Sequence, residues 1–253
     1  MHTEQAHAKL TVSLKMTGLR PDGYHLIDAE MVSLDLADTL TFTEGDGLTI
    51  TIAGTAASGL SIEANADNLV AKALRMLDRR AHVSIVKRIP AGGGLGGGSS
   101  DAAAVFRWAK QTGQQDIVAA AQLGADVSFC ILGGRARVRG IGEICDPLPF
   151  VPRSYTLLSP PFGVSTPAVY RAWDALGGPT VNGPNDLEPA ALVVEPRLGV
   201  WRDRLGNLTG QTPVLAGSGS TWFVEGTYSG SFDGVDLLPV QTIPALPPTE
   251  SRG

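Results

Sequence analysis

The sequence has little of the chemistry that cross-links a chain, gathers a metal cluster or spans a membrane. Its 253 residues include only two cysteines, Cys130 and Cys145, which are too few for a disulfide framework. Cysteine and histidine do not occur at zinc-binding spacings, and no apolar run is long enough to cross a bilayer. The first residues lack the basic and apolar segments of an export signal. These absences exclude a disulfide scaffold and a zinc finger, and they favour a cytoplasmic protein.

Positive charge is also in short supply. The chain has 20 Lys and Arg against 25 Asp and Glu, a formal net charge of −5. Such a balance gives no general attraction to nucleic acid or to an anionic membrane. A hydrophobic content of 43% and a length sufficient for one or two domains are typical of a globular protein. We therefore expect a small-molecule partner, no nucleic acid and no membrane, and either a monomer or a homodimer.

Glycine, by contrast, is abundant and concentrated in one stretch. Six glycines occupy the seven positions 92–98, followed by Ser99, Ser100 and Asp101. A segment with so few side chains can bring backbone N–H groups close to a bulky ligand. Ser99, Ser100 or Asp101 can cap the helix predicted to follow. The positive end of that helix would face the ligand, so the pattern predicts an anion site that suits phosphate.

Two familiar glycine patterns fit this stretch poorly. Gly92, Gly94 and Gly97 satisfy the dinucleotide pattern, but the required acid at the end of a second strand is missing, because Asp116 precedes a predicted helix. The Walker pattern requires a lysine where Gly98 stands. A nucleotide site here therefore needs a cation from elsewhere in the chain. A NAD-dependent oxidoreductase remains an alternative.

Hydrophobic patterns elsewhere indicate mixed helices and strands. Alternation predicts strands at residues 10–14, 39–43, 48–53, 83–86 and 155–158, the second and third joined as a hairpin. Helical spacing predicts helices at residues 67–77, 101–112 and 166–173, the first capped by an Asp or Asn. Arg135, Arg137 and Arg139 alternate along a short segment, which is typical of a solvated edge strand. By itself, Asp126 before an apolar run indicates a helix cap.

Several separated motifs resemble one known family, the GHMP kinases. The loop at residues 90–100 is similar to the phosphate loop of that family. Five further motifs follow in the expected order, and they are Ala8-Lys9-Leu10, Arg20-Pro21-Asp22-Gly23-Tyr24-His25, Gly124-Ala125-Asp126-Val127, Gly140-Ile141-Gly142-Glu143 and Gly217-Ser218-Gly219-Ser220. The resemblance covers roughly residues 8 to 225. The agreement of separated motifs makes it more specific than the glycine loop alone.

The resemblance implies an α+β fold of two domains, divided near the prolines at 147, 149 and 152. Residues 1–151 would form an ATP-binding domain like the second domain of ribosomal protein S5, and residues 152–253 a ferredoxin-like domain. The implied reaction is transfer of phosphate from ATP, with Mg²⁺, to an alcohol. The Asp-Gly-Tyr-His and Gly-Gly-Gly-Ser-Ser forms are similar to members that phosphorylate the 2-hydroxyl of CDP-methylerythritol in non-mevalonate isoprenoid biosynthesis. A kinase for homoserine or mevalonate and a catalytically silent binding protein are the alternatives.

The resemblance also assigns roles to residues. Asp126 would accept the hydroxyl proton, and Lys9 would orient the hydroxyl and supply the cation that the loop lacks. Tyr24 and Tyr170 would stack on cytosine while His25 bonds its edge, and Thr166 and Asn185 are weaker substrate candidates. Ser99 and Ser100 would bond phosphate or lie near Mg²⁺, with Ser100 as the candidate metal ligand. The ATP phosphates would be wrapped by Pro90, Ala91, Gly92, Gly93, Gly94, Leu95, Gly96, Gly97, Gly98, Ser99 and Ser100.

Three positions depart from the family pattern. Thr11 stands where relatives usually have Asn, and Met31 stands where an aromatic residue is common. The segment after Val224 is short, and residues 226–234 replace an expected helix. The second domain is therefore predicted to be trimmed. None of these departures removes the loop, Lys9 or Asp126.

Overall fold

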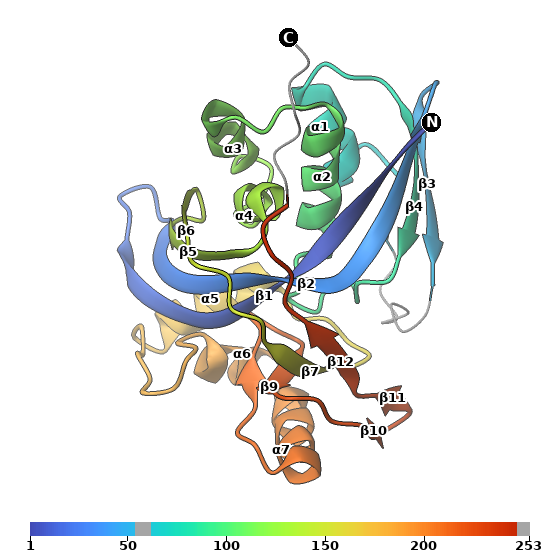
Figure 1. Cartoon of the computed structure of the whole chain (residues 1–253). Helices are drawn as coiled ribbons and strands as arrows, with labels where there is room; N and C mark the ends of the chain where they lie inside the picture. Colours follow the sequence, from blue (N-terminus) through green and yellow to red (C-terminus); the bar gives the residue numbers. More distant parts are fainter. Residues whose placement is uncertain (54–61, 247–253) are drawn as a thin grey trace.

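Two β-sheets with helices packed on them form the structure, a computed structural model that describes residues 1–53 and 62–246 (Figure 1). The first sheet has the order β3-β4-β2-β5-β6, with β1 also paired to β2. Its strands are β1 (His2–Leu19), β2 (His25–Thr43), β3 (Gly47–Ile52), β4 (His82–Lys87), β5 (Arg135–Gly140) and β6 (Ile144–Pro147). The mixture of sheets and helices confirms the predicted α+β class.

The second sheet has the order β12-β7-β9-β8. It comprises β7 (Ser154–Leu158), β8 (Val214–Leu215), β9 (Trp222–Glu225) and β12 (Leu238–Gln241). The segment after Val224 forms a two-stranded ribbon, β10 (Ser231–Phe232) with β11 (Val235–Asp236), where the family pattern has a helix. The predicted division at residue 151 falls between β6 and β7, and the two-domain description stays a prediction.

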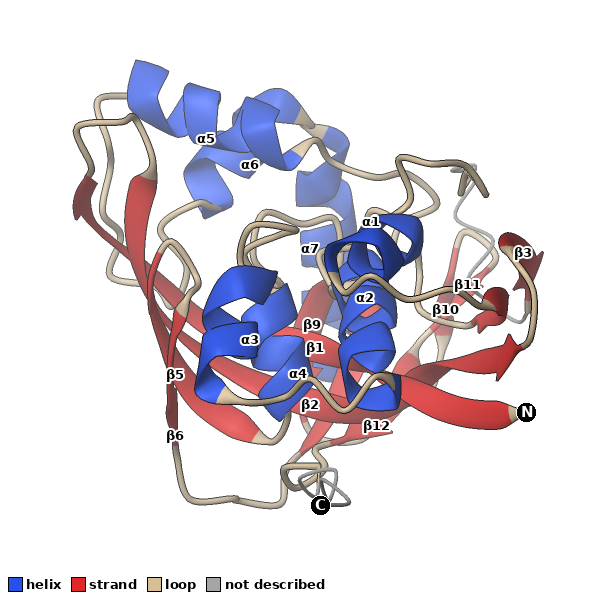
Figure 2. Cartoon of the chain, turned by 90° about the horizontal axis from the view of Figure 1, so that it is seen from above, coloured by secondary structure: helices blue, strands red, loops and turns tan. Residues whose placement is uncertain are grey.

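Seven helices occur in the described part of the chain, and Figures 1 and 2 show how they are distributed. One group lies against the first sheet and consists of α1 (Leu69–Met76), α2 (Gly97–Trp108), α3 (Gln114–Ala120) and α4 (Val127–Leu132). The other group lies beside the second sheet and consists of α5 (Thr166–Ala175), α6 (Glu188–Val194) and α7 (Arg197–Thr209). Within the described residues, no helix has the length and apolar character needed to span a membrane.

The predicted hairpin between residues 39–43 and 48–53 is wrong. β4 lies between β2 and β3, antiparallel to β2 and parallel to β3. The reason is burial, since β4 carries the fully or nearly fully buried Val83 and Ile85 and therefore takes the inner position. β3 is mostly exposed and takes the edge.

The predicted cationic edge strand is also wrong. β5 is paired on both sides, to β2 and to β6. Its three arginines meet carboxylates of the neighbouring strands, with Arg135 paired to Glu30, Arg137 to Asp28 and Arg139 to Asp146. The alternating sequence correctly places the three arginines on one face of the strand. Whether that face contacts solvent or carboxylates depends on which strands pair with β5.

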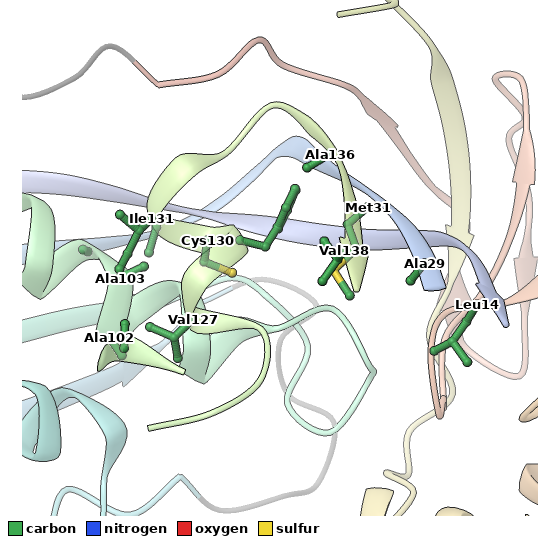
Figure 3. Packing of buried hydrophobic residues seen from close by; sticks show 14 of the residues in the cluster. Leu14, Ala29, Met31, Ala102, Ala103, Val127, Cys130, Ile131, Ala136 and Val138 are labelled. Carbon is green, nitrogen blue, oxygen red and sulfur yellow. The ribbon is translucent and has the colours of Figure 1, made fainter. Parts of the chain in front are cut away.

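Small side chains let α2 pack closely against α4 in the main core. Figure 3 shows Ala102 and Ala103 of α2 beside Val127 and Ile131 of α4. All four are buried. A second apolar cluster joins the two sheets, because Leu10 of β1 packs in the same cluster as residues of β7, β9 and β12. Both sheets thus support the loop that lies between β4 and α2.

Candidate active site

A cavity of about 1150 Å³ is lined by segments that are far apart in the sequence. Lys9 and Thr11 of β1, the glycine-rich loop, and Asp126 at the start of α4 form one end. Residues of α5 and of the turn between β1 and β2 form the other. Its size is suitable for a ligand with several chemical groups.

The glycine-rich loop leaves β4 and enters α2 while docked on a turn of the second sheet. Thr221 N donates to Gly93 O at 3.1 Å, and Ser220 N donates to Gly92 O. Gly94 has φ +76°, and a Cβ there would lie 2.3 Å from Ala216 O. Only glycine permits this approach, so the second sheet fixes the shape of the loop.

α2 begins inside the glycine run rather than after it. Its N-cap is Gly96 with φ +70°, and no side chain caps the helix. The predicted cap by Ser99, Ser100 or Asp101 is therefore wrong, because these residues lie within the first turns of the helix. The N–H groups of the first turn have no partners within the helix and are available to an anion.

The two serines that follow the loop have different surroundings. Ser99 lines the cavity. Ser100 is buried, and its hydroxyl donates to His7 O at 2.7 Å and contacts Cys130 Sγ at 3.3 Å. Ser100 thus ties α2 to β1, and the structure does not place its hydroxyl on the cavity lining as the family resemblance implied.

Lys9 and Asp126 come together at the same end of the cavity. Lys9 Nζ lies 3.2 Å from Asp126 Oδ2 and donates to Thr11 Oγ1 at 3.0 Å. The lysine is 5% exposed, and it runs so close under the loop that a Cβ on Gly96 would lie 2.7 Å from Lys9 Cγ. Asp126 stands at the N-cap position of α4 but makes no capping hydrogen bond. Its carboxylate is instead directed at Lys9.

A buried ion triad clamps the two ends of the loop, and the sequence patterns did not predict it. Lys87 of β4 donates to Asp38 and, at 2.6 Å, to Asp101 Oδ2 in α2. Asp38 also accepts from the backbone N–H of Arg88 and of Ile89, just before the loop. The alternation Val83, Ile85, Lys87 was a signal, because it places a lysine on the buried face of β4.

The triad has unusual proton affinities. Burial opposes a charge on Lys87, but Asp101 and Asp38 outweigh it and raise the lysine pKa. Burial also raises the pKa of Asp101, to about 7, although Lys87 acts against it. Asp101 Oδ1 is buried and has no hydrogen-bond partner in the described part of the chain. The clamp thus places a carboxyl group whose charge is disfavoured by burial directly behind the loop.

Aromatic and polar side chains gather at the other end. Tyr24, His25, Thr166 and Tyr170 all line the cavity, and their contact with a substrate stays a prediction. The ring centroids of His25 and Tyr170 are 5.0 Å apart. Burial, with a smaller contribution from Asp126, raises the pKa of Tyr170 to about 12, so its hydroxyl stays protonated at neutral pH.

Two weaker candidates have different positions. Thr166 Oγ1 is 2.8 Å from Ser218 Oγ at the cavity wall. Asn185 is 2% exposed and is absent from the cavity lining in the described residues. Its amide donates to Leu215 O and Gly217 O. Asn185 therefore holds the turn beside Lys9 rather than facing a ligand.

Comparison with known proteins was decisive for the family. Residues 68–134 match the family described as GHMP kinases N terminal domain. The 4-diphosphocytidyl-2-C-methyl-D-erythritol kinase of Paracoccus denitrificans (strain Pd 1222) is 37% identical over 87% of this chain and 85% of its own length. The chain belongs to the 4-diphosphocytidyl-2-C-methyl-D-erythritol kinase family.

Other relatives agree with this assignment. The enzyme of the same name from Cereibacter sphaeroides (strain ATCC 17029 / ATH 2.4.9) is 36% identical over 86% of this chain and 87% of its own length. A crystal structure of a 4-(cytidine 5'-diphospho)-2C-methyl-D-erythritol kinase is 31% identical, covers 88% of this chain and 89% of its own, and has a TM-score of 0.67. A crystal structure of a mevalonate kinase covers 96% of this chain and all of its own at 11% identity and a TM-score of 0.55, and it shares the fold alone.

Membership of this kinase family settles one point that the glycine pattern left open. The chain is a phosphotransferase of the GHMP type, which decides against a NAD-dependent oxidoreductase. The cation that the Walker pattern lacks is available from β1, where Lys9 lies under the loop. The departures at Thr11 and Met31 are both accommodated, since Thr11 accepts a hydrogen bond from Lys9 and Met31 is buried at the cavity lining.

Proposed function

We propose that this chain transfers the γ-phosphate of ATP to the 2-hydroxyl of 4-diphosphocytidyl-2-C-methyl-D-erythritol, with Lys9 and Asp126 at the reacting end of the cavity. The observation that carries the proposal is the Lys9–Asp126 pair, 3.2 Å apart, directly beneath an anion-binding loop. Phosphoryl transfer depends mainly on positioning and on neutralising charge. Backbone N–H groups of the loop, a buried ammonium and a carboxylate supply these requirements in one place.

The reaction assigns each group one task. Backbone N–H groups of the loop and of the first turn of α2 hold the ATP phosphates. Asp126 accepts the proton of the substrate hydroxyl as its oxygen forms a bond to the γ-phosphorus, while the bond from that phosphorus to ADP breaks. Lys9 keeps Asp126 in place and offsets the negative charge that builds up between the phosphate and the hydroxyl.

The oxygen donors near the loop suit a magnesium ion that travels with ATP. No cluster of three or more His, Cys, Asp or Glu side chains in the described residues could hold a metal by itself. Ser99 and Asp126 line the cavity beside the loop, and Mg²⁺ commonly takes one or two protein ligands besides phosphates and water. The ion would neutralise part of the negative charge of the phosphates. We propose Ser99 rather than Ser100 as the serine ligand, because the Ser100 hydroxyl already bonds His7 O.

The cytidine diphosphate part would occupy the aromatic end. Tyr170 and Tyr24 offer faces on which a pyrimidine can stack, and His25 offers a ring nitrogen to its edge. Tyr24 is 59% exposed and so has free surface to cover. Thr166, at the wall, is a further polar contact for the substrate.

An ADP-release assay with CDP-methylerythritol, mevalonate and homoserine tests the proposal. We expect turnover of the first alcohol alone, and a kcat about 10²- to 10⁴-fold lower in Asp126→Asn. Asp203→Asn, on the exposed side of α7, is the control for loss of one carboxylate. Turnover of mevalonate or homoserine would refute the proposed substrate. Tight ATP binding without turnover of any alcohol would favour a silent binding protein.

A further inference from the structure

A hydrogen bond between a histidine and an aspartate at the aromatic end of the cavity has no task in phosphoryl transfer. His25 is the first residue of β2, and Asp174 lies in the last turn of α5. His25 Nε2 and Asp174 Oδ1 are 2.7 Å apart. The Asp174 side chain is 49% exposed, and contacts of a carboxylate this open to water stabilise a fold only slightly. The contact therefore calls for an explanation other than stability.

The His25 ring is held on several sides by the same helix. The Tyr170 ring lies 5.0 Å from it at a tilt of 43°, and the Trp173 ring meets it edge-on at 5.6 Å and 85°. With Asp174 on Nε2, three side chains of α5 fix both the plane and the rotation of the imidazole. Its side chain is only 12% exposed. No residue in the described part of the chain forms a hydrogen bond with Nδ1, the other ring nitrogen of this cavity-lining histidine.

The partner on one nitrogen determines the chemistry of the other. An ionised carboxylate can only accept a hydrogen bond, so Nε2 must carry the proton that Asp174 receives. In the neutral imidazole Nδ1 is then unprotonated and is an acceptor. His25 thus offers a ligand a fixed acceptor rather than a donor.

We propose that Asp174 determines the base specificity of this site by holding His25 in the tautomer whose Nδ1 accepts a hydrogen bond. This proposal rests on the proposed function, and it requires the substrate base to present a hydrogen-bond donor to His25. Cytosine carries an amino group at C4, which donates, whereas uracil carries a carbonyl oxygen at the same place. The amino group of cytosine can donate a hydrogen bond to Nδ1. The carbonyl oxygen of uracil cannot, and its lone pair would repel the lone pair of Nδ1. Asp174 is therefore a positioning residue that selects an aminopyrimidine nucleoside diphosphate.

Binding of CDP and of UDP, measured by calorimetry without ATP, tests this selection independently of catalysis. We expect the unmodified chain to bind CDP at least about tenfold more tightly than UDP. In Asp174→Asn the side-chain amide can donate to Nε2 as well as accept from it, so both tautomers become available and the CDP-to-UDP ratio falls toward one. Asp203→Asn is the matched control, because Asp203 is an exposed acid of α7 that pairs with Arg202 and is absent from the cavity lining formed by the described residues. It should keep the ratio of the unmodified chain.

Nitrogen-15 NMR of the imidazole rings provides a readout that a merely structural role would not change. The chain has four histidines, so the His25 signals can be assigned by comparison with His25→Gln. We expect protonation at Nε2 in the unmodified chain and a mixture of tautomers in Asp174→Ala. With CDP- and UDP-linked methylerythritol as substrates, the Asp174 variants should lose discrimination through KM while kcat for the cytidine substrate changes little.

Each outcome bears on the inference. Three results would overturn it, even with an active kinase. The first is a proton on Nδ1 in the unmodified chain, and the second is an unchanged CDP-to-UDP ratio in both Asp174 variants. The third is equal binding of CDP and UDP by the unmodified chain. If no alcohol is phosphorylated but CDP is preferred and Asp174→Asn removes the preference, the proposed function fails and the base selection by Asp174 stands.

Discussion

At the scale of single residues, the reacting end of the cavity depends on how one buried ammonium is held. Lys9 reaches Asp126 on one side and Thr11 on the other. A Cβ on Gly217 would lie 3.7 Å from both Lys9 Nζ and Thr11 Oγ1, so the turn of the second sheet closes over the pair. The substitution of Thr for the usual Asn at position 11 thus keeps an oxygen that accepts from Lys9.

Removing that oxygen should impair catalysis more than folding. Thr11→Val preserves the shape of the side chain but leaves Lys9 with one acceptor fewer in a buried position. We expect kcat to fall about tenfold, KM for ATP to change little, and the free energy of unfolding to fall by about 1 kcal/mol. Steady-state kinetics and urea denaturation measure these changes. Thr3→Val, at the exposed end of the same strand, is the control, and an unchanged kcat in Thr11→Val would contradict the role given to Thr11.

The buried acid of the clamp should give stability a measurable dependence on pH. The pKa of Asp101 is raised to about 7, so the folded chain holds this proton more tightly than the unfolded chain. Its contribution to stability is complete below the ordinary pKa of an aspartic acid and is lost as the pH rises through about 7. Asp101→Asn should remove this dependence. The free energy of unfolding of the variant relative to the parent should therefore rise with pH, by up to about 1.4 kcal/mol per pH unit within the window.

Urea denaturation from pH 5 to pH 8 tests this, with Asp186→Asn as a buried control whose difference from the parent should stay constant over this range, because the pKa of Asp186 is lowered. Burial alone would raise the pKa of Asp186, but hydrogen bonds from Lys15, Met16 N and Val181 N outweigh it and lower the pKa. The stability that Asp186 provides is present above its ordinary pKa and is lost as the pH falls. A difference between Asp101→Asn and its parent that stays constant across the range would show that Asp101 is not protonated in the folded chain.

At the scale of elements, the glycine-rich loop is a backbone structure whose shape depends on contacts with the second sheet. Different glycines in it are required for different reasons. Gly94 has a positive φ and meets the backbone of the docking turn, whereas Gly98 lies in α2 and a Cβ there would meet only Leu69 Cδ1, at 3.5 Å. The loop therefore contains a matched pair of positions for testing the docking.

The two alanine substitutions should change stability in opposite directions. Gly94→Ala would bring a Cβ within 2.3 Å of Ala216 O and 2.9 Å of Gly219 O, so the loop must leave its docked position. We expect the free energy of unfolding to fall by at least about 2 kcal/mol and ATP binding to weaken. Gly98→Ala should raise it by up to about 1 kcal/mol, because alanine favours a helix. Thermal unfolding measures both, and equal stabilities would refute the docking explanation.

At the scale of the whole molecule, the two sheets are joined through apolar contacts rather than through a flexible linker. Leu10 and Val32 of the first sheet share one buried cluster with Leu157 and Phe223 of the second. The chain also returns to the first sheet after β12, where Thr242 bridges to Leu34. The cavity lies where these connections hold both sheets in place, so the geometry of the site depends on the entire fold.

The shared cluster predicts that the two sheets unfold together. Leu157→Ala should lower the free energy of unfolding by about 2 to 5 kcal/mol and leave a single calorimetric transition. Hydrogen exchange should show peptides from β1–β2 and from β7–β9 losing protection at the same rate. Val193→Ala is the control, since Val193 is 60% exposed and its truncation should cost little. Loss of protection in the second sheet alone would indicate that residues 152–253 unfold independently.

The sequence by itself determined the features that depend on local patterns. Alternation and helical spacing identified several of the strands and helices, and the order of separated motifs was enough to place Lys9, the loop and Asp126 at one cavity. The glycines of the loop could be recognised because their requirement is a property of the backbone.

Only the tertiary structure decided which distant residues meet. It placed β4 between β2 and β3, turned the Ser100 hydroxyl toward His7, buried Asn185 beneath a turn, and joined Lys87 to Asp38 and Asp101. His25 and Asp174 are 149 residues apart. Such contacts depend on how much apolar surface each element buries and on which charges are left to pair once the sheets and helices have packed, and a local pattern carries no record of either.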